Sequence, residues 1–573
     1  MGVSAAVFES AGKRTEHYIP GAYSRGNNVS SPNGVNAGNL CILGCATGGK
    51  PRDLLEFGSL SEAQDVLKSG DLLNAIGYAF KGSPDYVPSS VMAMRVNPGT
   101  QGTLTMKSGE TPMIEISSAD YGAHVNQIKV KVDTGTLAGS KKLSVSFQEN
   151  TTVVDNIIRK SMQIMAADGE NGTVTVTTTG ISLQTTVEDE VVSEEFLFED
   201  YPTVNDLVAR INDTDFFVAT MLDTNIDALS TELDTVASKD ISSAPVDLCS
   251  NFAAFCEELE KIQFFDEIKI LSENSRVMVD NMPFTYFTGG TTTKSASTSD
   301  WGLALAELET KDIQIITTIE SSPEIHSLIK DHCTTMSSTV NRKERSAWLG
   351  GPLNESDDDA MANARALNSS LISYVCDTAF VSNPFTGAKE KVAGSIFAVM
   401  LAGMESSMAV NMALTNKTLN VLGFAKTRTV TNMNNLIKAG VVVCQPSPDD
   451  PTNYVCIRSI TTYQKDDLIA NERSMTREAM YMDRDLRNRY GIGIGMPGNM
   501  PVSVIKQTLI ETAKEWAASG YIIPSDDGQN VWDIKVVRKG DKDCIQYSRY
   551  LTAPVNFVFI TANNYVYTSS TEL

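Results

Sequence analysis

The chain has 573 residues, of which 42% are hydrophobic and 20% charged, and its formal net charge is −23. This length exceeds a single domain of roughly 100 to 200 residues, so we expect three or four domains, each with enough apolar residues to fold. The acidic balance, 70 Asp and Glu against 47 Lys and Arg, argues against the chain as a whole being a nucleic-acid binder.

The first ten residues, MGVSAAVFES, lack the basic region and the long apolar stretch of a signal peptide. Gly2 fits half of a myristoylation signal, but Ala6 stands where Ser or Thr is required. The most apolar run, 392–404, is too short for the roughly 20 residues that cross a bilayer. We therefore expect no direct insertion into a membrane.

Nine cysteines are present without any C-x-x-C spacing. Most lie in apolar segments, where a thiol behaves as a small hydrophobic group. Cys444 and Cys456 lie symmetrically about Asp450, so they could face each other across a hairpin and form a disulfide. Reduced, buried thiols are the alternative, which a reducing cytoplasm favours.

In chain order, residues 1–38 contain Gly, Asn, Ser and Pro with little periodicity, which predicts an extended N-terminal arm. Residues 39–97 form the N-terminal part of the predicted trunk, with strands at 39–43 and 91–96 and a helix at 61–78. Residues 98–289 are predicted to be an inserted outer β-rich part, because four Gly-punctuated segments alternate polar and apolar residues. These segments are 113–117, 127–132, 143–147 and 173–178, with helices expected at 203–212 and 246–262.

Strands and helices alternate in the next part, 290–415, which predicts a parallel α/β trunk domain. The expected strands are 312–316, 346–349 and 372–376, and the expected helices are 323–333, 357–367 and 392–404. Residues 416–573 are predicted to form an α+β C-terminal inner domain. Its expected elements are a hairpin of 441–444 with 454–460, helices at 466–490 and 501–519, and strands at 532–537 and 555–561. The predicted fold class is therefore α/β and multi-domain, with extended terminal arms.

The helix predicted for 466–490 has two distinct faces. Met475, Ala479, Met482 and Leu486 share one apolar side, which we expect to be buried. The opposite side carries Arg473, Arg477, Arg484 and Arg487. Such a stripe is either a solvated face or a face that meets a partner. Residues 416–550 hold 18 basic and 15 acidic residues, so the rest of the chain carries −26. This distribution favours an inner, partner-facing part within an acidic protein, although ordinary acidic solubility remains open.

One segment suggests nucleotide chemistry. Gly44–Lys50 follows a strand and satisfies G-x-x-x-x-G-K, but the next residue is Pro51, which has no hydroxyl to hold magnesium. The following glycine, Gly58, comes too soon for a helix of normal length to receive phosphate. Four scattered histidines offer no zinc-like spacing, and we interpret the carboxylates of 357–359 as favouring a helix start. We therefore expect no catalytic residues, no metal site and no cofactor.

Segments of the second half carry a family resemblance through their order. LTNKTL at 414–419 is followed by NLIKAGV at 435–441, the predicted hairpin, SITTY at 459–463 and the long charged helix. This order resembles the C-terminal half of contractile phage tail sheath proteins. Gly21 and residues 39–51, 58–75 and 91–96 resemble the family's N-terminal domain, and GGPLNES at 350–356 with ARALN at 364–368 resembles its central domain. The resemblance covers more than half of the chain but not 98–289.

The resemblance implies a structural subunit, not an enzyme, that polymerises as stacked hexameric rings around a tail tube. Contraction of this sheath would drive the tube through the host envelope. The implied partners are other copies of the chain, the tail tube protein, and the baseplate and tail terminator proteins, with no nucleic acid. The implied location is the virion tail, assembled in the host cytoplasm. The sheath of a related contractile injection system is the alternative within this class, and a P-loop nucleotide hydrolase is the alternative from another class.

The same resemblance assigns roles to two sets of residues. The stripe of Arg473, Arg477, Arg484 and Arg487 is expected to face the tail tube. The N-terminal arm and the strand at 555–561 are expected to add strands to neighbouring subunits. Tyr18, Ile19, Val555, Phe557 and Phe559 are the residues expected to take part in this pairing.

Overall fold

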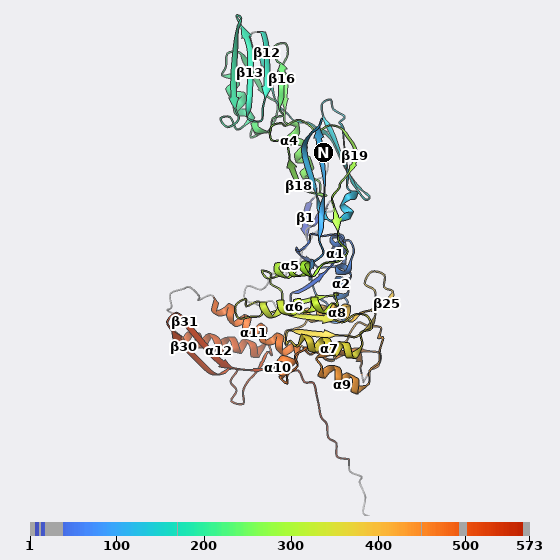
Figure 1. The fold of residues 1–573 in the computed structure, drawn as a ribbon. Coiled ribbons are helices and arrows are strands. Elements are labelled where there is room, and N and C mark those ends of the chain that lie inside the picture. Colours follow the sequence, from blue (N-terminus) through green and yellow to red (C-terminus); the bar gives the residue numbers. More distant parts are fainter. Residues whose placement is uncertain are drawn as a thin grey trace, which may run out of the picture. The chain divides into compact units, whose positions relative to one another are not determined.

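The computed structural model describes residues 6–10, 13–17, 38–168, 170–447, 450–491 and 501–564. The chain divides into two compact units (Figure 1). Unit 1 consists of Met1–Ala46, Pro51–Asn97 and Ser295–Leu573, and unit 2 consists of Thr47–Lys50 and Pro98–Lys294.

An eight-stranded sheet forms the centre of unit 1, in the order β28-β27-β23-β22-β21-β3-β5-β4. The six strands from β27 to β5 are mutually parallel, and an antiparallel strand closes each edge. The parallel layer predicted from the alternation of strands and helices is therefore present. Its strands are β3 (Leu40–Gly44), β4 (Leu54–Phe57), β5 (Val91–Arg95), β21 (Ile315–Thr318), β22 (Ser346–Gly350), β23 (Ile372–Val375), β27 (Val441–Pro446) and β28 (Tyr454–Arg458).

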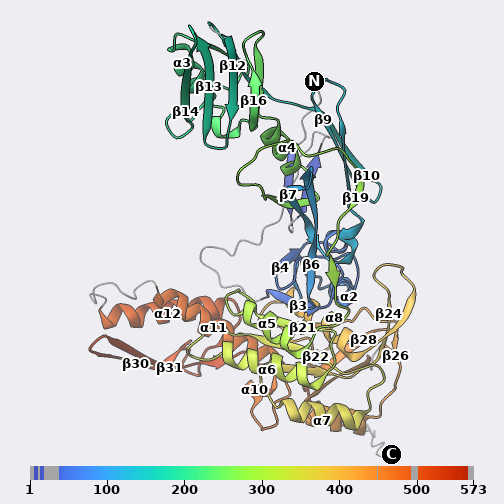
Figure 2. The same cartoon turned by 45° about the horizontal axis from the view of Figure 1, so that its top comes forward.

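Helices cover both faces of this sheet because its strands are apolar on both sides. Leu40 and Ile42 of β3 belong to one core with α1 (Leu60–Leu67), α2 (Asp71–Ala79) and α8 (Gly394–Ser406). Cys41 and Leu43 belong to the other core, with α5 (Thr298–Leu308), α6 (Pro323–Met336), α7 (Asp357–Leu367) and α9 (Val430–Lys438). Figure 2 shows α5 and α6 beside strands β21 and β22 of the sheet. Among the described residues, no helix combines the length and apolarity of a membrane span.

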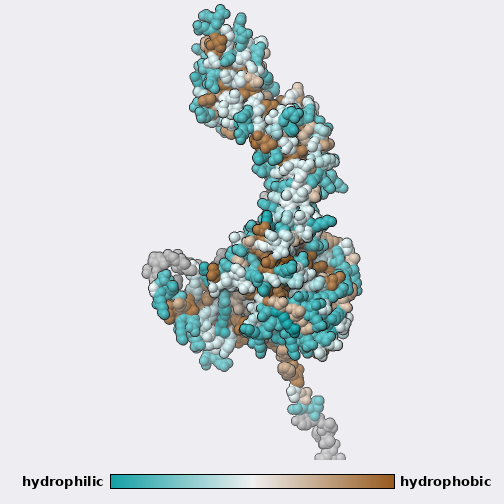
Figure 3. Space-filling model, in the orientation of Figure 1, coloured by the Kyte–Doolittle hydropathy of each residue, from teal (hydrophilic) through white to brown (hydrophobic). Residues whose placement is uncertain are grey.

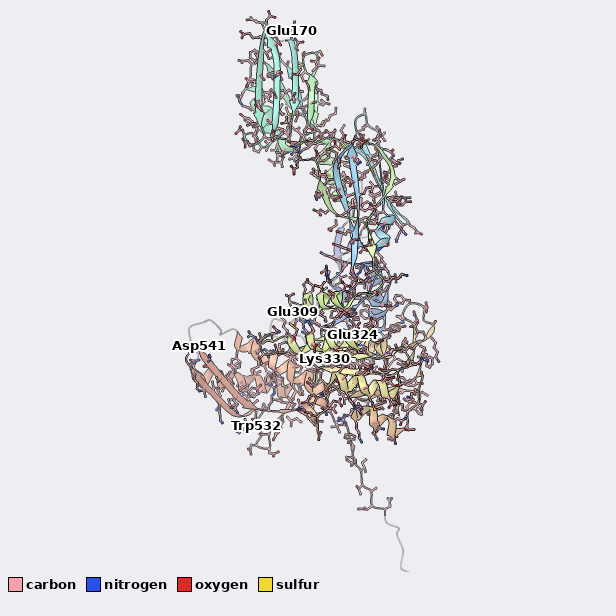
Figure 4. All side chains as sticks on the ribbon, viewed as in Figure 1. Glu170, Glu309, Glu324, Lys330, Trp532 and Asp541 are labelled. Carbon is pink, nitrogen blue, oxygen red and sulfur yellow. The ribbon has the colours of Figure 1, made fainter. Side chains whose placement is uncertain are left out.

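A third core of unit 1 lies near the C-terminus. It joins α11 (Arg473–Gly491) and α12 (Val502–Ala518) through Met482, Leu509 and Trp516. Two small antiparallel pairs complete it: β29 (Ile522–Ile523) with β32 (Tyr550–Leu551), and β30 (Trp532–Lys539) with β31 (Lys542–Ser548). Trp532 and Asp541, labelled in Figure 4, mark the base and the turn of the β30–β31 hairpin.

The part predicted as a C-terminal domain at 416–573 is therefore not one structural body. Strands β27 and β28 belong to the trunk sheet, and α9 packs on its face. Parallel pairing of β23 with β27 draws this segment into the trunk, and pairing over such a sequence distance is not visible in a local pattern. A small three-stranded sheet also joins β26 (Gly423–Phe424) to two strands of the predicted trunk part, β24 (Ala379–Ser382) and β25 (Lys389–Val392).

Unit 2 contains two hydrophobic cores, and all its strand pairs are antiparallel, as the alternating patterns predict. The first core lies between the sheets β10-β9-β8-β19 and β18-β7-β6-β20 with α4 (Asn251–Glu260). These strands are β6 (Gly99–Ser108), β7 (Thr111–Tyr121), β8 (Lys129–Thr134), β9 (Lys141–Phe147), β10 (Asn150–Ile157), β18 (Phe265–Ile270), β19 (Met282–Tyr286) and β20 (Thr291–Thr292).

The second core of unit 2 lies between the sheets β15-β11-β17 and β14-β13-β12-β16 with α3 (Val204–Asn212). Its strands are β11 (Lys160–Ala166), β12 (Glu170–Val176), β13 (Gly180–Val187), β14 (Glu190–Leu197), β15 (Phe217–Met221), β16 (Val236–Asp240) and β17 (Val246–Cys249). The helix predicted for 246–262 is wrong at its start, because 246–249 pair with β11.

The arm predicted for residues 1–38 contains two described strands. β1 (Ala6–Ser10) pairs with β2 (Lys13–His17) in an antiparallel hairpin, so these two segments bond to each other. The nine cysteines are free thiols. Cys444 and Cys456 are register partners between β27 and β28, so the predicted geometry is present without the disulfide.

Candidate functional site

The segment with the arginine stripe begins at a break in the chain. The single helix predicted for 466–490 is in fact two helices, α10 (Leu468–Asn471) and α11. Between them Glu472 has an extended backbone with ψ 118° and forms a bridge to Ile460. The break turns α11 so that its first two turns enter the trunk while its second half packs on α12.

Arg473 is wholly buried at the start of α11, and all five of its N–H groups have acceptors. Nε and Nη2 donate to the Glu405 carboxylate at 2.8 and 2.7 Å. The remaining donors reach Ala347 O at 3.0 Å, Ser373 Oγ at 3.2 Å and Ser346 Oγ at 3.1 Å. The guanidinium carbon lies 4.6 Å from the centre of the Trp348 ring. A guanidinium can be buried when all its donors are paired in this way.

Glu405 and Arg477 complete this buried cluster. Burial alone would raise the pKa of Glu405, but Arg473 and Arg477 outweigh it and hold the pKa below its usual value. Trp348 Nε1 also donates to Glu405, at 2.8 Å. Arg477 lies 3.6 Å from Glu405 and is buried, which lowers the pKa of its guanidinium although Glu405 opposes this effect. The cluster joins α8, β22 and α11 through buried hydrogen bonds.

Arg484 and Arg487 lie further along α11 and contact the loop before β22. Arg484 Nη2 donates to Glu344 O at 2.7 Å, and Arg487 Nη2 donates to the Glu344 carboxylate. The side chain of Arg484 is 13% exposed and that of Arg487 is 35% exposed. These two side chains therefore lie at the rim of an intramolecular contact.

The expectation that all four arginines point away from their own domain is wrong for Arg473 and Arg477. A helical wheel separates the arginines from the apolar face but does not show what packs on the opposite side. Here the trunk sheet and α8 cover that side, so residues 472–478 are all buried. Nothing in the local sequence around α11 identifies Glu405 and Glu344 as the partners of these arginines. The one sequence feature that pointed to a buried charge was Glu405, which directly follows the apolar run 392–404.

Glu478 is a buried carboxylate on α11 itself. It has no exposed surface, and neither carboxylate oxygen has a hydrogen-bond partner among the described residues. Burial raises its pKa to about 8, with the nearby Arg549 opposing the effect. Glu478 is therefore mainly protonated at neutral pH, unlike Glu405.

The C-terminal segment after β32 is extended and pairs with no other strand within 552–564. The strand predicted for 555–561 is thus absent from the isolated chain. Val555, Phe557 and Phe559 are 82%, 67% and 92% exposed. Figure 3 shows hydrophobic residues along this segment where it leaves the body of unit 1. Tyr18 and Ile19, the residues predicted to pair in the N-terminal arm, lie outside the described residues.

The turn with the G-x-x-x-x-G-K pattern lacks the features of a phosphate-binding loop. The chain continues through a turn into strand β4, whereas a phosphate-binding loop leads into a helix. The backbone N–H of Gly49 donates to Asp120 Oδ1 at 2.7 Å. A carboxylate therefore occupies the position next to an amide that phosphate would use, which contradicts the P-loop alternative.

A surface hollow of about 310 Å³ in unit 1 collects ionisable residues at the end of β23. Arg428 pairs with Asp357 and Asp377, and Lys426 pairs with Asp357 at 2.8 Å. Asp377 also accepts the N–H of Cys444 at 2.9 Å. Asp377 in the hollow and the neighbouring Asp357 are thus both paired with cations, and the pairs with Asp357 hold the loop before α9 on the start of α7. Among the described residues, no group of three or more potential ligands could hold a metal.

Comparisons with known proteins agree with one another. No family model matches the chain. The tail sheath protein of Bacillus phage SP01 is 24% identical, with 96% of each chain covered. The tail sheath protein of Staphylococcus phage Twort is 22% identical, with 78% of this chain and 80% of that protein covered. In fold, the chain is similar to a sheath tail protein from Listeria innocua, with a TM-score of 0.54, 12% identity, and 90% and 95% of the two chains covered.

Proposed function

Because the chain belongs to the contractile phage tail sheath family, we propose that it polymerises with copies of itself as stacked six-subunit rings around a tail tube. The chain is a structural component of the virion tail. Its alignment over 96% of a phage tail sheath protein is the observation that carries the proposal. The proposed partners are a tail tube protein and the baseplate and tail terminator proteins, with assembly in the host cytoplasm.

The buried arginine cluster supports a mechanical role for the subunit. Contraction of a sheath requires subunits to move relative to one another, and rigid bodies transmit such movement better than soft ones. Glu405, Arg473 and Trp348 join α8, α11 and β22 through hydrogen bonds that have no solvent exposure. We propose that unit 1 moves as one body and that its contacts with other copies rearrange.

The exposed C-terminal segment supports the proposal that copies are linked by strand addition. Its backbone N–H and C=O groups at 555–561 and its alternating apolar side chains suit pairing with another chain. The β30–β31 hairpin is a suitable acceptor, because a two-stranded sheet offers two unpaired edges and gains stability from further strands. We propose Val555, Phe557 and Phe559 as donor residues, with Tyr18 and Ile19 in the N-terminal arm.

The tube-facing role is proposed for Arg484 and Arg487 alone. Both keep partial exposure, whereas Arg473 and Arg477 are buried against their own trunk. Exposed charge pairs are worth about 0.2–1 kcal/mol each and are screened by salt. Contacts of this size could slide during contraction and still add up over many subunits.

Electron microscopy of the purified chain tests the proposal. We expect tubes with six-fold rings, because sheath subunits carry their own linking segments. Phe559→Pro should abolish the tubes, since proline removes one backbone donor from the added strand. Phe559 is 92% exposed, so the melting temperature of the monomer should not change. Phe559→Leu keeps the donor and the apolar side chain and is the matched control. Tubes of normal length from Phe559→Pro would contradict strand addition by this segment.

A further inference from the structure

The C-terminal segment contacts its own unit at two points before it leaves the surface. At the first, Thr552 donates its backbone N–H to Tyr521 O at 3.1 Å and its hydroxyl to Gly520 O at 2.8 Å. At the second, Asn556 Nδ2 donates to Glu472 Oε1 at 2.9 Å. The first point belongs to the turn after α12, and the second belongs to the break between α10 and α11. The segment therefore runs from the C-terminal core to the trunk.

The second contact is built around a buried carboxylate. Glu472 has no exposed surface, and its Oε1 also accepts Arg458 Nε at 2.8 Å and Nη2 at 2.6 Å. The guanidinium carbon of Arg458 lies 5.7 Å from the centre of the Phe557 ring. Arg458 thus connects Glu472 to the segment by a charge-assisted pair on one side and an aromatic contact on the other.

The contact with the subunit weakens at Phe557. Asn556 is half-buried, Phe557 is 67% exposed, and Val558, Phe559 and Ile560 are 75%, 92% and 86% exposed. The contact is also incomplete, since Glu472 Oε2 and Asn556 Oδ1 are buried without a hydrogen-bond partner among the described residues. One side-chain hydrogen bond and one ring contact can open without disturbing the fold.

We propose that Glu472 and Arg458 clamp the C-terminal segment to its own subunit at Asn556 and Phe557, within the stretch proposed to pair with a second copy. The proposal rests on the proposed function of the segment as a link between copies. Glu472 and Arg458 are positioning residues: they set the point and direction at which the link leaves the subunit. Such preorganisation reduces the entropy that is lost when the segment binds a neighbour.

Limited proteolysis of the full-length monomer tests the clamp independently of assembly. Chymotrypsin cleaves after phenylalanine, and we expect cleavage after Phe559 to be faster than cleavage after Phe557. Asn556→Ala should raise the rate after Phe557 about tenfold, because cleavage follows the population of the open segment. Glu472→Gln should have a similar effect. Asn563→Ala, on the exposed part of the same segment, is the matched control and should change neither rate.

Glu472 is buried, so Glu472→Gln can impair folding. Asn556 is only half-buried, and Asn556→Ala therefore tests the same contact without this risk. Equal cleavage after Phe557 in the wild type and in Asn556→Ala would overturn the clamp. For assembly, we expect Asn556→Ala to raise the protein concentration needed for tubes about tenfold. An unchanged concentration would overturn the positioning role. Wild-type protein with a protected Phe557 site but no tubes would overturn the proposed function and leave the clamp standing.

Discussion

Glu405 and Glu478 show how one residue type acquires opposite properties on the two sides of α11. Both carboxylates are buried, so desolvation disfavours the charge of each. Glu405 lies against two guanidinium groups and its pKa falls, whereas Glu478 lacks a hydrogen-bonded partner among the described residues and its pKa rises to about 8. The number of cations within hydrogen-bond reach therefore decides the ionisation state.

The raised pKa of Glu478 predicts a pH dependence of stability. An unfolded Glu loses its proton near pH 4.5, but the folded protein keeps it until about pH 8. The folded state thus binds more protons in this window, so the free energy of unfolding should fall as pH rises from about 5 to 8. Glu478→Gln cannot ionise and should lack this fall, with a difference that grows to roughly 1–3 kcal/mol by pH 8.

Thermal unfolding followed by tryptophan fluorescence measures the Glu478 effect, because all four tryptophans, Trp301, Trp348, Trp516 and Trp532, belong to unit 1. Glu511→Gln on the exposed surface of α12 serves as the control. If the difference in stability between wild type and Glu478→Gln stayed constant from pH 5 to 8, Glu478 would be ionised in the folded protein throughout this range, which would contradict the prediction.

At the scale of elements, the start of α11 acts as a buried connection between the C-terminal core and the trunk. Glu472 breaks the helix, and the next residue, Arg473, enters the ends of β22 and β23 through Ala347, Ser346 and Ser373. Removing one partner of a buried pair leaves an uncompensated charge, which is more damaging than losing the pair's own attraction. The coupling of the two parts of unit 1 should therefore depend on Glu405.

Glu405→Ala should destabilise unit 1 by about 3–5 kcal/mol, because Arg473 and Arg477 would remain buried without a carboxylate. Glu405→Gln keeps one acceptor for Arg473 and should destabilise less. Urea unfolding followed by tryptophan fluorescence reports unit 1 selectively, since unit 2 contains no tryptophan. Glu511→Ala removes an exposed carboxylate paired with Lys514 and should leave the midpoint unchanged. A midpoint for Glu405→Ala equal to that of Glu511→Ala would contradict the connection.

At the scale of the whole molecule, charge is concentrated in unit 2. Residues 98–294 contain 31 acidic and 13 basic residues, a net charge of −18 out of −23. Figure 3 shows many hydrophilic residues on the visible face of this unit. The two ends of the insertion lie side by side, since Thr291 pairs with Thr100 and Thr293 N donates to Pro98 O at 3.2 Å. A short bridge can therefore replace the insertion without stretching the chain.

Replacing residues 99–292 by a short Gly/Ser bridge should leave a folded unit 1 that still forms tubes. Removal of the acidic unit should also lower the protein concentration needed for tubes at low salt, because like charges on neighbouring copies repel. The difference from the full chain should shrink as added salt screens this repulsion. Sedimentation at several salt concentrations measures it. A folded truncated chain that never polymerises would place the insertion within the subunit contacts.

Local patterns in the sequence determined much of this fold. Alternating polar and apolar residues predict the antiparallel strands of unit 2, and apolar runs between helices predict the parallel layer around β21, β22 and β23. Helix α7 begins and ends where its acidic first turn and its apolar spacing indicate, at Asp357 and Leu367. The order of short segments also identified the sheath family. The strands and helices could be predicted because their patterns arise between residues that are close in the sequence.

Only the tertiary structure decided what faces the arginine stripe and where the C-terminal segment is held. Arg473 meets Glu405 across 68 residues, and Asn556 meets Glu472 across 84. The helical period places Arg473 opposite Met475 and Met482 but carries no information on an element that packs there. The parallel pairing of β27 with β23 adds the segment before α11 to the trunk sheet, where Arg473 meets Glu405. The burial of a charge depends on such distant partners, so it follows from the assembled fold and not from the local sequence.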